Sequence, residues 1–95
     1  MRAVDADALG IEQAQRAERV AALRKQRMLL EGLHEDIGIS IGLLSSIPSG
    51  SRWRSPAETV YGRRRDELRR ELGAAQRQLG DAVTAVSWAI AAAEE

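Results

Sequence analysis

Residues 51–61 read S-R-W-R-S-P-A-E-T-V-Y, which predicts a turn that leads directly into a capped helix. Ser55 can accept a hydrogen bond from a backbone N–H of the first helical turn. Glu58, three residues on, can reach back to the N–H of Ser55, which completes a capping box. Pro56 suits the first helical position, because the N–H that it lacks has no partner there. A helix is therefore predicted to start at residue 56.

A heptad pattern follows this start and continues to about residue 93. Its positions alternate in steps of four and three residues, the spacing with which one helix packs against another. They are Tyr61, Arg65, Leu68, Leu72, Ala75, Leu79, Ala82, Val86, Ala89 and Ala93. Val60, Val83 and Ile90 widen the apolar stripe. The spacing predicts one helix over about 56–93.

The sequence before the turn predicts another long helix, over about 6–46, with Asp5 or Asp7 as its cap. Steps of three, four and seven residues place its apolar side chains on one face. They are Val20, Leu23, Leu30, Leu33, Ile37, Ile41 and Leu44. Arg27 and His34 fall at or beside this face.

The segment Gly38-Ile39-Ser40-Ile41-Gly42 alternates small and apolar residues, which leaves a short strand as an alternative to helix. We expect helix, because a lone strand has no partner here. Two glycines cost about 1 kcal/mol each relative to alanine, so a kink or an early end to the helix stays open. Gly38 and Gly42 share a face, where another backbone could approach closely. Pro48 ends the helix, and a turn is expected over about 47–55.

These elements predict an all-α fold, an antiparallel two-helix hairpin that forms a single domain over residues 1–95. A hairpin this long cannot cover both apolar stripes by itself, and two hairpins commonly solve this by forming a four-helix bundle. We therefore expect a dimer. The expected partner-interface residues are Val20, Leu23, Leu30, Leu33, Ile37, Ile41, Leu44, Leu68, Leu72, Leu79, Val86 and Ile90.

Composition argues against several functional classes. The chain has 14 basic and 14 acidic residues, so zero net charge gives no general attraction to nucleic acid or anionic lipid. It has no cysteine and one histidine, and neither a glycine-rich phosphate loop nor a pair of catalytic carboxylates can be recognised. We expect no enzyme, no metal, no cofactor and no small-molecule substrate.

Two further patterns bear on membranes and secretion. The most apolar run, residues 37–47, is shorter than the ~20 residues that a membrane-spanning helix needs. The N-terminal residues carry acids where a Sec signal peptide has its apolar core. If the chain leaves the cell, we expect it to do so without a Sec signal.

Arginines near the turn raise the alternative of a nucleic-acid-binding hairpin. Residues 52–70 contain seven arginines against three acids, and the candidate contacts are Arg63, Arg64, Arg69 and Arg70. However, Arg63–Glu67 and Asp66–Arg70 are spaced as ion pairs on a solvated helix face. No compact DNA-reading motif accompanies them, so nucleic acid is not the expected partner.

Trp53, followed by Ala57-Glu58 and by Tyr61 eight positions after the tryptophan, lies between two long helices. This arrangement resembles the WXG family of bacterial type VII secretion proteins. The family has a glycine where this chain has Ser55. Members of the family often carry a tyrosine followed four residues later by an acid, just after the second helix. Here the only tyrosine is Tyr61, and Arg65 occupies that offset.

The resemblance implies a non-enzymatic interaction module with a turn motif of Trp53, Ser55 and Tyr61. It would form a four-helix bundle with itself or with a paired WXG-like small helical protein. Further implied partners are a larger type VII effector and the secretion ATPase, and the implied location is the cytoplasm before export. The missing tyrosine–acid pair implies that this chain is the partner without the export signal.

Several alternatives stay open. The chain could instead be a cytoplasmic coiled-coil adaptor or structural protein unconnected with secretion, which would make Trp53 incidental. The Trp53 ring could pack over the end of the hairpin, or form part of a surface presented beside a partner's tail. Trp88 is expected to be partly buried at an interface.

Overall fold

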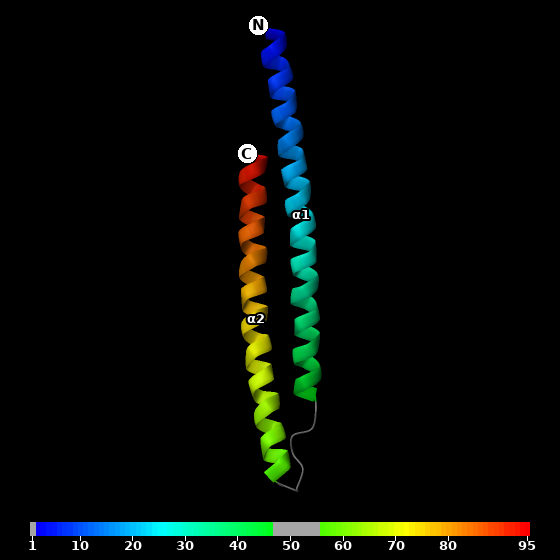
Figure 1. Ribbon diagram of the computed structural model, residues 1–95, viewed down its shortest axis with the longest axis vertical. Helices are drawn as coiled ribbons and strands as arrows, with labels where there is room; N and C mark the ends of the chain where they lie inside the picture. The colour runs from blue at the N-terminus through cyan, green and yellow to red at the C-terminus, as the bar shows by residue number, and fades with distance from the viewer. Residues whose placement is uncertain (1, 47–55) are drawn as a thin grey trace.

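In the computed structural model, two long α-helices form an antiparallel hairpin (Figure 1). The structure describes residues 2–46 and 56–95. Helix α1 spans Arg2–Ser46, and helix α2 spans Pro56–Glu94. The all-α hairpin predicted from the sequence is confirmed. The predicted turn at 47–55, which contains Trp53 and Ser55, lies outside the described residues.

Helix α1 begins earlier than expected. It starts at Arg2, before Asp5 and Asp7, so the expectation that one of these aspartates caps it is wrong. Residues 2–7 contain neither glycine nor proline to stop the helix, and alanine favours it. The helix also runs without interruption through the segment 38–42, so no strand forms there. Packing against α2 offsets the low helix propensity of the glycines in this segment.

Helix α2 begins at Pro56, the helical position that a proline occupies without losing a hydrogen bond. Glu58 lies in the first turn, where its negative charge favours the positive end of the helix dipole. The helix ends at Glu94, one residue beyond the expected boundary. Both helix starts thus follow from local residue chemistry, proline at α2 and alanine at α1.

The hairpin is elongated and has almost no core. It measures 83 × 17 × 14 Å, with a radius of gyration of 22.9 Å, whereas a compact chain of this length has about 12 Å. Its accessible surface is 7821 Å², against roughly 5,400 Å² for a compact monomer of this mass. Val20 and Ile90 are the only buried apolar residues in the part of the chain whose burial is described.

The N-terminal part of α1 continues past the end of α2, as Figure 1 shows. Residues 8–19 are all exposed, including Leu9 and Ile11, which are each 58% exposed. Helix α2 therefore covers only the later part of α1, and the first turns of α1 have no neighbouring helix within the described chain.

Glycine substitutions test the fit between the helices. A methyl group added at Gly42 meets no atom within 4 Å, whereas one added at Gly38 comes within 3.0 Å of Gln76 Nε2 on α2. Because alanine is about 1 kcal/mol more favourable than glycine in a helix, Gly42→Ala should raise the free energy of unfolding by about that amount. Gly38→Ala should raise it less, because the Gln76 side chain has to move. Denaturant unfolding at one fixed chain concentration measures both values, and an equal gain would contradict the contact at Gly38.

Candidate helix-pairing interface

Each helix turns one row of side chains toward the other, with the spacing of a coiled coil. On α1 this facing row consists of Val20, Leu23, Arg27, Leu30, His34, Ile37, Ile41 and Leu44. On α2 it consists of Gly62, Arg65, Arg69, Leu72, Gln76, Leu79, Val83, Val86, Ile90 and Ala93. All but two of the expected partner-interface residues therefore lie between the helices of one chain. The exceptions, Leu33 and Leu68, are 52% and 44% exposed.

The facing row of α2 differs from the predicted heptad at every second position. It passes through Arg69, Gln76, Val83 and Ile90 instead of Leu68, Ala75, Ala82 and Ala89. In this rotation Ile90 is only 5% exposed, and burying valine and isoleucine removes more apolar area from water than burying alanine does. At the turn end, Arg69 takes the place of Leu68 in the row, and Leu68 lies at the edge of the contact, where it is 44% exposed.

Small residues lie opposite the polar members of the facing rows. Arg27 Nη1 donates to Ser87 Oγ over 3.5 Å. Seven residues later on α1, His34 lies against Gly80 of α2, where an added methyl group would be 3.7 Å from Nε2. From one contact to the next, the residue number rises by seven on α1 and falls by seven on α2, which is the register of an antiparallel heptad pair. Ser87 and Gly80 have short side chains or none, so the longer side chains of Arg27 and His34 fit between the helices.

The end of the interface near the turn is polar. The Nε atoms of Arg65 and Arg69 are buried and have no hydrogen-bond partner. Nearby ion pairs join Arg64 to Glu67 at 3.4 Å and Arg69 to Asp66 at 4.0 Å. These pairs are three residues apart, rather than the four residues predicted for Arg63–Glu67 and Asp66–Arg70. Because the pairs are exposed, each contributes little to stability.

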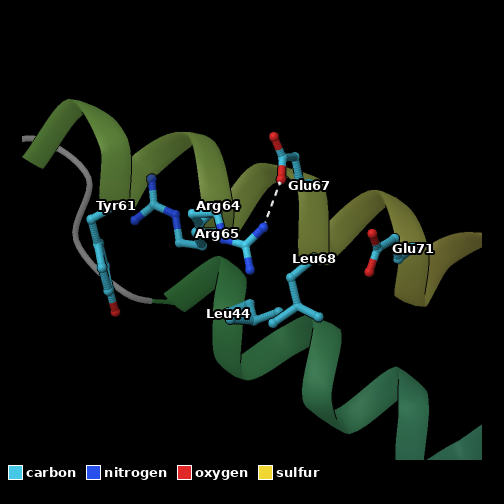
Figure 2. Close-up of a pocket in the computed structure, with 7 residues that line it drawn as sticks. All are labelled: Leu44, Tyr61, Arg64, Arg65, Glu67, Leu68 and Glu71. Carbon is cyan, nitrogen blue, oxygen red and sulfur yellow. Dashed lines mark hydrogen bonds and ion pairs between the residues drawn. The ribbon is translucent and has the colours of Figure 1, made fainter.

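A shallow pocket of about 280 Å³ opens at this end, along one edge of the contact between the helices. Figure 2 shows Leu68 pointing toward Leu44, while Tyr61 lies nearer the start of α2, with Arg64 and Arg65 between it and Leu68. Arg64, Arg65, Glu67 and Glu71 complete the lining. The mixture of charges around an open apolar floor suits contact with a protein surface better than it suits an enclosed reaction site.

A broad apolar face continues along this edge, and we call it the leucine–alanine face. On α2, five of its residues follow one another at seven-residue steps and two more lie one turn away: Tyr61, Leu68, Ala75, Ala82 and Ala89, with Ala85 and Ala92. On α1 it consists of Ala22, Leu29, Leu33 and Leu43, and the exposed Asp36 lies between Leu29 and Leu43 in the same seven-residue row. Toward the turn, the row of Ala85 and Ala92 continues through the polar residues Gln78, Glu71 and Arg64. Leu30, Ile37 and Leu44 are seven residues apart and form one row on α1, and Leu33 lies next to this row. Leu29 and Leu43 are 61% and 64% exposed.

The opposite edge, which we call the polar flank, carries mostly charged and small residues, together with Met28, which is 71% exposed. Gly38, Gly80 and Ser87 contact the other helix there. Arg24 pairs with Glu94 at the end of α2, and both side chains remain exposed. Arg63, Arg70 and Arg77 lie beyond this contact on α2. Exposed leucines thus gather along one edge of the hairpin, although Met28, Ile39 and Trp88 are also exposed on its other sides.

Other expected features have different outcomes. Trp53 and Ser55 lie outside the described residues. Tyr61 is 61% exposed at the rim of the pocket. Trp88 was expected to be partly buried, but in the hairpin it is 73% exposed because it lies on the side of α2 that points away from α1. Within the described ranges, no cluster of three potential metal ligands occurs. No helix in the same ranges has the length and apolar character needed to cross a membrane.

Comparison of the chain with protein families, curated proteins and solved structures found no match. The sequence does not predict the leucine–alanine face as a separate surface, because its heptad pattern places Ala75, Ala82 and Ala89 in the row between the helices. The three- and four-residue spacing of Ala82, Ala85, Ala89 and Ala92 is the signal that could have identified it.

Replacing Arg69 tests the polar end of the interface. An unpartnered buried donor costs about 1–3 kcal/mol, so Arg69→Leu should raise the free energy of unfolding by about 1 kcal/mol. Arg70→Leu is the matched control, because Arg70 is exposed, and its effect should stay within about 0.5 kcal/mol. Denaturant unfolding measures both changes. A loss of stability in Arg69→Leu would show that the guanidinium has a stabilising role.

Proposed function

We propose that this chain is a non-enzymatic interaction module that pairs, hairpin against hairpin, in a four-helix bundle. The observation that supports this most directly is the exposed apolar surface: Leu29, Leu33, Leu43, Tyr61 and Leu68 share one side of the hairpin. The total accessible surface of 7821 Å² exceeds that of a compact monomer by roughly 2,400 Å². Pairing removes part of this surface, including the exposed leucines, from water, and the burial of apolar area is the main favourable term in association.

We further propose that the module belongs to a type VII secretion system, as a WXG-like escort or secreted protein. The support is the order of Trp53, Ala57-Glu58 and Tyr61 along the sequence. Tyr61 is exposed at the rim of the pocket, where a partner can reach it. The partners would be a second copy or a paired WXG-like chain, then a larger effector and the secretion ATPase. The chain would reside in the cytoplasm before export.

Solution mass tests the pairing. Light scattering or sedimentation should give a two-chain mass for the purified protein at micromolar concentration, or a one-to-one complex after co-expression with the small helical protein encoded beside it. A single-chain mass in both preparations would overturn the proposed module, because the exposed leucines would then have no partner.

Export of a Trp53→Ala variant tests the secretion role. Pairing should persist, because the facing rows and the leucine–alanine face do not include Trp53, while export into the medium should be lost. Trp88→Ala removes the other tryptophan, which is exposed on α2, and should leave export unchanged. Absence of export for the native chain and every variant would favour a cytoplasmic coiled-coil adaptor.

A further inference from the structure

One stretch of the leucine–alanine face is free of charge, although 29% of the residues in the chain are charged. On α1 it lies between Arg19, in the seven-residue row of Leu33, and Asp36, in the seven-residue row of Leu29. On α1, Ala22, Leu29 and Leu33 have only Gln26 between them on this side. On α2, Ala82 and Ala85 continue into Ala89 and Ala92 without a polar side chain on the same side. An uncharged group of leucines and alanines on one side of a helix pair is typical of a surface that a partner covers.

The register of the hairpin sets the leucines and alanines side by side. Two contacts, Arg27 with Ser87 and His34 with Gly80, join the helices seven residues apart. Leu29 and Leu33 lie between these contacts on α1, while Ala82 and Ala85 lie between them on α2. Two leucines of α1 therefore lie at the same height along the molecule as two alanines of α2.

We infer that a second copy of this chain covers the leucine–alanine face. The two copies are related by a twofold axis that lies between them, parallel to the long axis of the hairpin. Leu29 and Leu33 of each copy then pack against Ala82 and Ala85 of the other. Because one face carries both complementary halves, a second copy supplies the matching surface without any change of sequence. This inference rests on the proposed pairing function, which it deepens by naming the partner and the face.

The available area and the charge both suit this occupant. Tyr61 to Ala92 spans about 47 Å of helix at 1.5 Å per residue, and the hairpin is 17 Å wide. The face thus offers about 800 Å² per chain, and two copies together bury about 1,600 Å², the standard size of a stable interface. The chain has zero net charge, so two copies do not repel one another.

Charge insertion on the two sides of the hairpin tests the face. Leu29→Glu and Ala85→Glu should each raise the dissociation constant of the dimer by at least about tenfold, because an unpaired carboxylate is buried. The matched controls are Met28→Glu and Ala91→Glu, which change exposed apolar neighbours on the side of the polar flank and should change it by less than about twofold. Sedimentation equilibrium gives the constants, and circular dichroism verifies that each variant keeps its helices.

Disulfide trapping tests the relative placement of the two copies, since the chain has no cysteine of its own. A tagged Leu29→Cys chain mixed with an Ala85→Cys chain should form a covalent heterodimer on mild oxidation, because the two sulfurs meet across the interface. A Met28→Cys chain mixed with an Ala91→Cys chain should not.

The outcomes separate this inference from the broader proposal. Stronger disruption by the controls, or trapping through Met28→Cys and Ala91→Cys, would move the interface to the polar flank and leave the pairing module standing. A native chain that is monomeric alone but pairs with a different helical protein would overturn the second copy as the occupant. A native chain that pairs with neither would overturn both proposals.

Discussion

The single line of contact between α1 and α2 determines the rest of the structure. Each helix contributes one narrow row, and in the part of the chain whose burial is described only Val20 and Ile90 become buried. A seam this thin removes little apolar area per residue from water, while ordering each residue costs about 1–2 kcal/mol of conformational entropy. Most of the apolar side chains remain at least partly exposed, so the hairpin gains its remaining apolar stabilisation only when another surface covers it. The fold and the proposed function therefore follow from the same shortage of buried area.

Much of the fold was accessible from the sequence because it depends on local chemistry. Proline and the Ser55–Glu58 motif predict the start of α2, and the three-and-four spacing on α1 predicts its facing row, including the positions of Arg27 and His34. The rotation of α2 was not accessible in the same way. Apolar residues occupy two adjacent rows on α2, and a periodicity of seven fits both. The choice between them depends on which row offers larger side chains opposite α1, which is a property of the pair and not of either helix.

That rotation links the two sides of the hairpin. When Val83 and Ile90 turn inward, Arg69 and Gln76 turn inward with them, because all four lie at seven-residue steps on a rigid helix. Leu68 and Tyr61 lie at the edge of the contact for the same reason. Ala75 and Ala82 are half-buried at this edge, and Ala85, Ala89 and Ala92 are exposed. The position of the leucine–alanine face thus follows from which row of α2 faces α1. The same residues could not have been assigned to an outer surface before the inner row was known.

The contact between the helices is apolar at the end away from the turn and polar near the turn. At the end away from the turn it consists of Val20, Val86 and Ile90, and the Arg24–Glu94 pair closes it. Near the turn it contains Arg65 and Arg69, whose buried Nε atoms have no partner. The end that carries Tyr61 therefore has fewer apolar contacts between the helices than the opposite end. A partner that covers Leu68 and Tyr61 therefore adds apolar contact where the isolated hairpin has least.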